Sequence, residues 1–130
     1  MNVVNTITVA DIALVGLGEV GGRFLAEMLK LKERGIRVVA VAEPSDTPGR
    51  RQAAADGIAV RSMDEIVAMG HAVDVIFDLT GVPSVRKQLR EKMQETGNRH
   101  TIIAPETMAR MLWAVVSEDH LIGGHGDRGY

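Results

Sequence analysis

The sequence is typical of an α/β protein, with a doubly wound, mainly parallel sheet and helices on both faces. Three observations indicate this architecture. Short runs of β-branched and aliphatic residues alternate with segments of helical periodicity along most of the 130 residues. Glycine or proline residues separate most of these segments. The connections are short, as expected for parallel strands joined by right-handed crossovers.

The composition limits the kinds of protein that the chain can be. A length of 130 residues suits one domain, and 15 basic against 17 acidic residues give a net charge of -2. No basic footprint for nucleic acid is present, and zero cysteines exclude disulfides and cysteine-based metal sites. No apolar run reaches the roughly 18 residues of a membrane span, and the first residues lack the basic segment of a signal peptide. We therefore expect a soluble, cytoplasmic domain without nucleic-acid or membrane partners.

The first strand and the first helix have the strongest patterns. Residues 7–17 are mostly β-branched and aliphatic and end in glycines, which predicts a strand. Val20, Phe24, Met28 and Leu31 then recur at helical spacing, which predicts an amphipathic helix with Gly35 as its C-terminal cap.

The remaining elements alternate in the same way. Ser62 and Glu65 form a capping box at the start of a short helix. The expected strands and helices are 36–42 (strand), 50–56 (helix, opened by Pro48), 58–60 (strand), 62–70 (helix), 73–79 (strand), 83–97 (helix), 101–104 (strand) and 105–116 (helix). Residues 1–116 are thus expected to form one domain, and 117–130 a glycine-rich tail whose backbone entropy opposes regular structure.

A glycine motif follows the first predicted strand and opens the first predicted helix. It matches G-x-G-x-x-G, and its members are Gly16, Leu17, Gly18, Glu19, Val20 and Gly21. Gly16 would allow the tight turn, Gly18 would let the backbone approach a pyrophosphate at the helix N-terminus, and Gly21 would allow close packing of the helix on the sheet. The alternative is that the glycines only shape the turn. The context predicts a dinucleotide site at residues 16–21.

An acidic residue lies where such a site needs one. Glu43 follows the second predicted strand, about 22 residues after Gly21, and can accept a hydrogen bond from a ribose 2′-hydroxyl. An acid there repels a 2′-phosphate, which favours NAD(H) over NADP(H), although Arg50 and Arg51 follow closely and can neutralise a phosphate. The alternative for Glu43 is a solvated strand end.

The turn after the fourth predicted strand is expected at the same edge of the sheet. Thr80, Gly81 and Pro83 lie there, so we expect them to contact the second half of a dinucleotide in the crevice where the strand order reverses. The alternative is that Thr80 and Gly81 only form a turn and Pro83 only starts a helix.

Two stretches resemble a known family. Residues 12–22 (IALVGLGEVGG) and 73–81 (VDVIFDLTG) are similar to the NAD-binding domain of homoserine dehydrogenases, and the layout is shared with glucose-fructose oxidoreductase-like families. The resemblance covers about residues 7–116 and implies a Rossmann fold that binds NAD. It also shows two departures. We expect no counterpart of the second, catalytic domain of those dehydrogenases in this chain, and residues 104–107 (APET) lack the Asn-Lys pair that they carry near the nicotinamide.

The functional expectation follows from these departures. We expect a stand-alone NAD(H)-binding domain that acts as a binding, sensing or assembly subunit, and we identify no catalytic residue. One alternative is a small oxidoreductase completed by homo-oligomerisation, with helix 105–116 or the tail at the interface. Another is a Rossmann module that binds a different nucleotide, such as coenzyme A or an adenylate.

Other residues give weaker signals. We expect His71 and His100 at ordinary surface positions, and the helix around Trp113 to be either deeply buried or part of a subunit interface. His120 and His125 lie among acidic residues in the tail. Because the neighbouring glycines leave these ligands unorganised, we expect a polar tail and no metal site.

Overall fold

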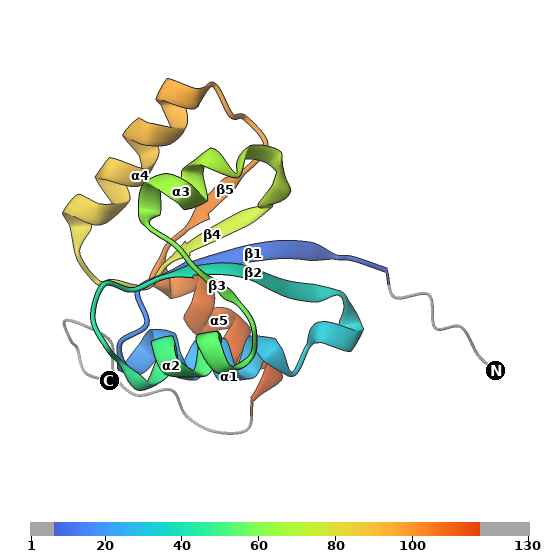
Figure 1. The fold of residues 1–130 in the computed structure, drawn as a ribbon. Coiled ribbons are helices and arrows are strands. Elements are labelled where there is room, and N and C mark those ends of the chain that lie inside the picture. Colours follow the sequence, from blue (N-terminus) through green and yellow to red (C-terminus); the bar gives the residue numbers. More distant parts are fainter. Residues whose placement is uncertain (1–6, 118–130) are drawn as a thin grey trace.

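The computed structural model describes residues 7–117 and shows one five-stranded, all-parallel sheet in the order β3-β2-β1-β4-β5. Helices α1, α2 and α5 cover one face of the sheet, and α3 and α4 cover the other (Figure 1). The strands are β1 (Ala10–Val15), β2 (Ile36–Ala42), β3 (Ala59–Val60), β4 (Val75–Asp78) and β5 (Ile102–Ala104). The predicted doubly wound α/β fold is confirmed.

The helices lie between the strands in the predicted order. They are α1 (Glu19–Leu29), η1 (Lys32–Arg34), α2 (Pro48–Ala55), α3 (Met63–Ala68), η2 (Gly70–Ala72), α4 (Pro83–Thr96) and α5 (Glu106–Val116), where η1 and η2 are single 3₁₀ turns. The two 3₁₀ turns are the elements that the sequence patterns did not predict.

The strand order reverses between β1 and β4. From β1 the chain proceeds outward to β2 and β3, and then crosses to the opposite side of β1 to form β4 and β5. At the carboxyl ends Val15 of β1 lies between Ala42 of β2 and Asp78 of β4. Connections leaving neighbouring strands in opposite directions open a crevice at this edge, which is where ligands bind in open α/β sheets.

Two apolar layers pack on the two faces because side chains alternate along each strand. Leu14 and Phe77 face α1 and α5, and the rings of Phe24 and Phe77 lie 5.0 Å apart at an angle of 57°. Ala13 and Ile76 face α3 and α4, where they pack with buried residues such as Leu89. The sheet is therefore shared by two separate cores.

The expected first strand, residues 7–17, is too long at both ends. The strand begins at Ala10, and the side chains of Ile7 and Val9 before it are 76% and 66% exposed. Leu17 lies beyond the strand, after the turn at Gly16, and is fully buried. The helix expected to reach Leu31 ends at Leu29, and Gly35 (φ +97°) caps η1 instead of that helix.

Several helix ends form as predicted. The hydroxyl oxygen of Ser62 accepts from the N–H of Glu65 at 3.1 Å, and the Glu65 carboxylate accepts from the N–H of Ser62 at 2.8 Å, which confirms the capping box. Pro83 occupies the first turn of α4, and Gly97 (φ +70°) ends that helix. Helix α2 starts at Pro48, two residues earlier than expected, because the Thr47 hydroxyl caps it by accepting from Arg50 N–H at 3.1 Å.

Helix α5 buries one side and exposes the other. Ala109 and Trp113 are buried, whereas Met108, Met111, Leu112 and Val115 are exposed, Val115 by 81%. The expectation of a deeply buried helix is therefore wrong, and the subunit interface remains a prediction. The predicted tail and its histidine cluster, including His120 and His125, lie outside the described residues.

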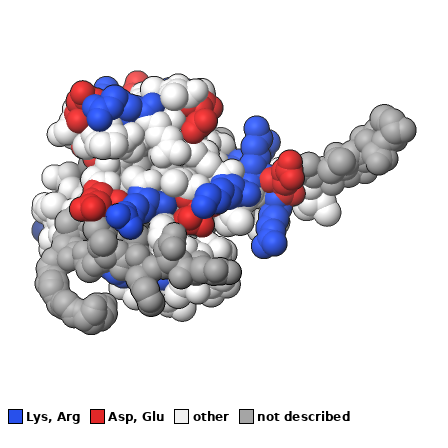
Figure 2. Space-filling view, turned by 90° about the horizontal axis from the view of Figure 1, so that it is seen from below, with Lys and Arg blue, Asp and Glu red and all other residues white. Residues whose placement is uncertain are grey.

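Charge is mixed on the surface seen in Figure 2. On that face, basic and acidic side chains lie next to one another over the described residues, without a continuous basic area. Within residues 7–117, no helix combines the length and apolar character needed to cross a membrane.

Candidate functional site

The glycine turn after β1 is forced by its neighbours. Gly16 has φ +99°, and a Cβ there would lie 2.9 Å from the carbonyl carbon of Leu79 and from the nitrogen of Thr80. Both a left-handed backbone and the contact with the turn after β4 therefore require glycine. The predicted tight turn at Gly16 is present.

Gly21 is required by a second close approach. A Cβ at Gly21 would lie 2.0 Å from the carbonyl oxygen of Gly16. The first turn of α1 thus packs against the glycine turn itself, whereas the sequence suggested packing on the sheet. At Gly22 a Cβ would meet the Cα of Gly49 in α2 at 3.5 Å, an ordinary contact.

Gly18 differs from both. It has an ordinary backbone conformation (φ −71°), and a Cβ there would have no atom within 4 Å among the described residues. The fold itself does not require glycine at this position. Gly18 is the N-cap of α1, and no side chain within residues 7–117 caps this helix. The hydrogen bonds within the helix begin with the one from Gly22 N–H to the Gly18 carbonyl, at 2.7 Å. The main-chain N–H groups before Gly22 in the first turn of the helix are therefore left for other acceptors.

Glu43 ties the end of β2 to the glycine turn. One carboxylate oxygen, Oε1, accepts from Leu17 N–H at 2.7 Å, and Oε2 accepts from Ser45 N–H at 3.0 Å. A solvated strand end is therefore the wrong description of Glu43. Each carboxylate oxygen retains further acceptor capacity, so these bonds leave room for a ribose hydroxyl.

A cavity of about 720 Å³ opens beside the glycine turn. Its walls come from the carboxyl ends of β1, β2, β3 and β4. They include the predicted residues Gly16, Gly18, Glu43 and Thr80, together with Val15, Ala42, Pro44, Arg50, Val60, Arg61, Ser62, Met63, Leu79, Val82 and Val85. We call this cavity the Glu43 cavity.

The other predicted site residues lie around this cavity. The Leu17 and Val20 side chains are buried in the core, and Gly21 packs on Gly16. Glu19 lines a different hollow, formed by α1 and the start of α2, which Gly18 and Gly49 line as well. Gly81 and Pro83 line a separate small cavity described below.

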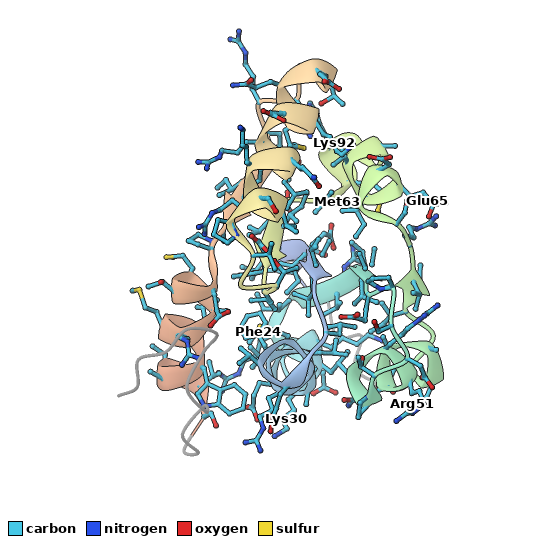
Figure 3. All side chains as sticks on the ribbon, turned by 90° about the vertical axis from the view of Figure 1, so that its left-hand side faces the viewer. Phe24, Lys30, Arg51, Met63, Glu65 and Lys92 are labelled. Atoms are coloured by element: carbon cyan, nitrogen blue, oxygen red, sulfur yellow. The ribbon has the colours of Figure 1, made fainter. Side chains whose placement is uncertain are left out.

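Arg50 and Arg61 place positive charge at the wall of the Glu43 cavity. The guanidinium of Arg50 donates to the carbonyl of Pro44 at 3.2 Å, and neither arginine has a carboxylate partner among the described residues. Arg51 instead pairs with Asp46 at 2.8 Å, on the outer side of α2 (Figure 3). Of the two arginines suggested by the sequence, only Arg50 therefore faces the cavity. Arg61 was missed although the strand before it was predicted, because only the position of β3 beside β2 brings this residue to the cavity.

The turn after β4 is held by its own side chains. The Oδ1 atom of Asp78 accepts from the Thr80 N–H at 3.1 Å and from the Thr80 hydroxyl at 2.7 Å. The Thr80 hydroxyl oxygen in turn accepts from Val82 N–H at 3.1 Å. Thr80 does shape this turn, and it also lines the Glu43 cavity.

A second, smaller cavity lies beyond this turn. It has a volume of about 210 Å³ and is formed between the first turns of α4 and α5. Its lining residues are Asp78, Gly81, Val82, Pro83, Arg86, Pro105, Glu106 and Thr107. Val82 lines both cavities, so the two lie side by side at the carboxyl edge, with Val82 between them.

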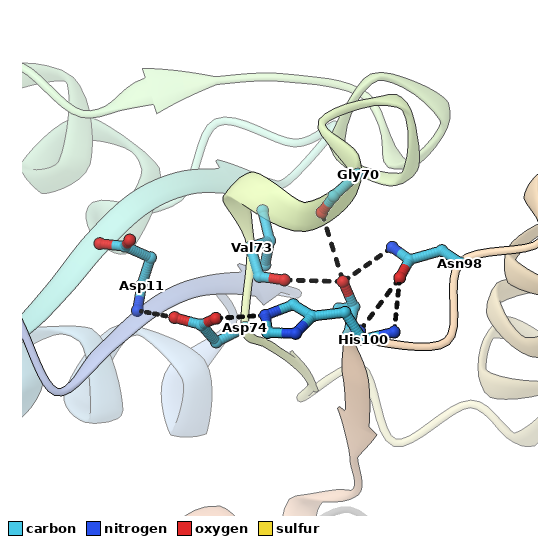
Figure 4. A network of polar contacts seen from close by, with 7 residues as sticks. Asp11, Gly70, Val73, Asp74, Asn98 and His100 are labelled. Atoms are coloured by element: carbon cyan, nitrogen blue, oxygen red, sulfur yellow. Dashed lines mark hydrogen bonds and ion pairs between the residues drawn. The ribbon is translucent and has the colours of Figure 1, made fainter.

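The opposite, amino edge of the sheet carries a separate polar network (Figure 4). Asp74 accepts from Asp11 N–H at 2.8 Å through Oδ2, and its Oδ1 lies 2.5 Å from Nε2 of His100. The bond from the Asp11 main chain, followed by that from His100, lowers the pKa of Asp74 below its ordinary value. His100, expected at an ordinary surface position, thus joins β4 to the loop before β5. In residues 7–117, no three His, Asp or Glu side chains are grouped to hold a metal ion.

Comparison with known proteins gives similarity in structure alone. No family model and no curated protein sequence matches the chain. Homoserine dehydrogenase from S. aureus at pH 6.5 matches with a TM-score of 0.52 and 16% identity, over 84% of this chain and 30% of that one. GenD2 from gentamicin A biosynthesis, in complex with NAD, gives a TM-score of 0.48 and 16% identity, over 78% of this chain and 35% of that one.

These matches bear on the fold. The chain spans about a third of the length of the two solved structures. At 16% identity, the match to homoserine dehydrogenase confirms the resemblance seen in the sequence for the architecture alone. Together with the parallel sheet and its reversal between β1 and β4, it establishes a doubly wound fold of the Rossmann type for residues 7–117.

Proposed function

We propose that the chain binds NAD(H) in the two cavities at the carboxyl edge of the sheet. The pyrophosphate would lie at the N-terminus of α1 beside Gly18, and the adenosine would enter the larger cavity with its ribose at Glu43. The observation that carries the proposal is the open space at Gly18, where the fold places glycine without needing it. A ligand that approaches the backbone at this position would explain why a side chain is absent there.

The uncapped start of α1 supports the same placement. Main-chain N–H groups at a helix N-terminus bind anions because their dipoles add and their hydrogen-bond donors are unused. The side chain of Glu19 does not close this end, since it is 68% exposed and lies 4.0 Å from Arg23 on the solvent side of α1.

The experiment is calorimetric titration of NAD⁺ and NADH into the wild-type chain and two glycine variants. Gly18→Ala places a methyl group at the wall of the Glu43 cavity and should weaken binding about tenfold or more. It leaves the fold nearly unchanged, because the N-cap preference for glycine over alanine is worth only about 1 kcal/mol. Gly22→Ala is the matched control, since its Cβ points to α2 and not into the Glu43 cavity. Absence of binding to the wild-type chain at millimolar ligand would overturn the proposal.

We further propose that the chain serves as the cofactor-binding part of an assembly, as a binding or sensing subunit. The exposed apolar face of α5, formed by Met108, Met111, Leu112 and Val115, is suited to a subunit contact. In the alternative enzyme, a homo-oligomer would complete an oxidoreductase site. Light scattering with an assay for NADH formation distinguishes the two, because a monomer without turnover excludes the homo-oligomeric enzyme.

A ligand with an additional phosphate on its adenosine is the second candidate. Arg50 and Arg61, which lack carboxylate partners among residues 7–117, favour NADP(H) or coenzyme A. Titration of NADP⁺ and coenzyme A beside NAD⁺ tests this. If the phosphate is bound there, Arg61→Gln should weaken NADP⁺ about tenfold and leave NAD⁺ unchanged. An equal effect on both ligands would exclude a phosphate contact at Arg61.

A further inference from the structure

The small cavity between α4 and α5 contains a buried carboxylate oxygen without a partner. Asp78 is only 4% exposed. Its Oδ1 atom accepts two bonds from Thr80, whereas Oδ2 has no hydrogen-bond or ion-pair partner among the described residues. A buried acceptor without a donor is costly, so a partner from a ligand would stabilise it. Asp78 lines the cavity, which is therefore built to receive a hydrogen-bond donor.

The same cavity also offers donors. Thr107, in the first turn of α5, lines it, and neither the main-chain N–H nor the hydroxyl of Thr107 has a partner among the described residues. Arg86 of α4 lines it as well, without a carboxylate partner in residues 7–117. Glu106 of α5, which accepts from Arg110 Nε at 3.2 Å, also lines the cavity. Acceptors and donors together suit a small group that both donates and accepts, as a primary carboxamide does.

The position of the cavity suggests which ligand group could reach it. Val82 lies between the two cavities, so a dinucleotide bound in the Glu43 cavity and extended past Val82 would place its second half near Asp78. We propose that Asp78 determines ligand specificity by accepting a hydrogen bond through Oδ2 from the carboxamide NH₂ of a nicotinamide. This inference rests on the proposed binding of NAD(H). The carboxamide oxygen would then accept from the donors on the α4 and α5 walls.

The test compares three ligands that differ only at this end. NAD⁺ carries the carboxamide, nicotinic acid adenine dinucleotide carries a carboxylate in its place, and ADP-ribose lacks the ring. The wild-type chain should bind NAD⁺ about tenfold or more tightly than the nicotinic acid analogue, because Oδ2 of Asp78 finds no donor on a carboxylate and repels it.

The decisive variant is Asp78→Asn. Its oxygen keeps both bonds from Thr80, and its NH₂ group replaces the acceptor Oδ2 with a donor. We expect the preference between NAD⁺ and the nicotinic acid analogue to disappear or reverse, while affinity for ADP-ribose stays unchanged and shows that the site is folded. Asp64→Asn, an exposed change in α3 at an ion pair with Lys92, is the control and should retain the wild-type preference.

The outcomes separate the two proposals. If the wild-type chain binds ADP-ribose but does not distinguish NAD⁺ from its nicotinic acid analogue, the role of Asp78 is overturned and the proposed function stands. The same holds if Asp78→Asn retains the preference or weakens all three ligands equally. If the wild-type chain binds none of the three, the proposed function fails, and this inference fails with it.

Discussion

Three glycines within six residues have three different reasons to be glycine. Gly16 has a left-handed backbone in contact with the turn after β4, Gly21 packs on the Gly16 carbonyl, and Gly18 faces open space. The motif in the sequence assigned the turn to Gly16, close packing to Gly21 and the approach of a ligand to Gly18, but it did not show which atoms exclude a side chain at the first two. At Gly16 those atoms belong to Leu79 and Thr80 in the turn after β4, and at Gly21 to the Gly16 carbonyl.

The contrast between Gly21 and Gly22 gives a stability prediction. Gly21→Ala places a Cβ 2.0 Å from a main-chain oxygen that cannot move without distorting the turn. We expect a loss of about 3 kcal/mol in the free energy of unfolding, measured by urea denaturation. Gly22→Ala, where the nearest atom is 3.5 Å away, should change it by no more than about 1 kcal/mol. Equal midpoints for Gly21→Ala and the wild-type chain would contradict the described packing.

Side chains that both stabilise the fold and line a cavity were the hardest to predict. Glu43 was expected to contact a ribose, and its bonds to the N–H groups of Leu17 and Ser45 were not foreseen. The strand order offers a signal for these bonds. Because β1 and β2 are adjacent and parallel, Glu43 after β2 lies next to the glycine turn after β1. Asp78 lies within the predicted strand 73–79, and nothing in that pattern indicates that its carboxylate is buried beside the first turns of α4 and α5.

Strands and helices were predicted well where the local pattern determines them. The bounds of β2 were as expected, and α4 began at Pro83 and ended before Gly97, because proline and glycine mark those ends. The start of β1 was wrong because pairing, and not composition, sets it. Ala10 pairs with Ile36, the first residue of β2, and β4 joins only from Ile12 onward. Ile7 and Val9 are apolar enough for a strand but precede the first paired residue, although Val9 N–H donates to the Gly35 carbonyl at 2.7 Å.

The amino ends of β1 and β4 are joined by Asp74, which makes stability depend on pH. Its pKa is lowered in the folded chain, first by the Asp11 N–H and then by His100. A carboxyl group of this kind stabilises the fold above its unfolded pKa of about 3.9, and the contribution is lost as the pH falls through the lower, folded value.

Asp74→Asn tests this dependence. The amide keeps an acceptor for Asp11 N–H but loses the charge, so the free energy of unfolding should fall at pH 7. Its difference from the wild-type chain should shrink as the pH is lowered below about 4. Urea denaturation at several pH values measures it, with Asp46→Asn, at an exposed ion pair with Arg51, as the control. A difference that is independent of pH would contradict the role given to the Asp74 charge.

The domain combines two cores that share one sheet. The layer beneath α1, α2 and α5 and the layer beneath α3 and α4 use opposite sides of the same strands. We therefore expect a single unfolding transition, as for most domains of this size.

The overall fold class could be predicted from the sequence because alternating strands and helices admit few arrangements. The site could be predicted only in part, because Arg61 and Asp78 reach it through the strand order.

Leu89→Ala tests whether the two layers unfold together. Leu89 is fully buried in the layer of α3 and α4, so the change should cost about 2–5 kcal/mol. Trp113, the single tryptophan, is buried on the other side of the sheet and reports on that layer by fluorescence. Fluorescence and far-ultraviolet circular dichroism should shift by the same amount. Lys87→Ala, at an exposed site on α4, should shift neither by more than about 0.5 kcal/mol. An unshifted fluorescence transition in Leu89→Ala would show independent layers.

The bonds from Glu43 to both neighbouring turns have a kinetic consequence. Because protein atoms alone fix the amide directions around Gly16 and Leu17, the rim of the Glu43 cavity is pre-organised by folding. A molecule that enters it spends little of its interaction energy on immobilising the backbone. Diffusion and orientation, and not loop rearrangement, then limit association, so we expect association rate constants of about 10⁵–10⁷ M⁻¹s⁻¹. Related nucleotides that differ in affinity should differ mainly in their dissociation rates.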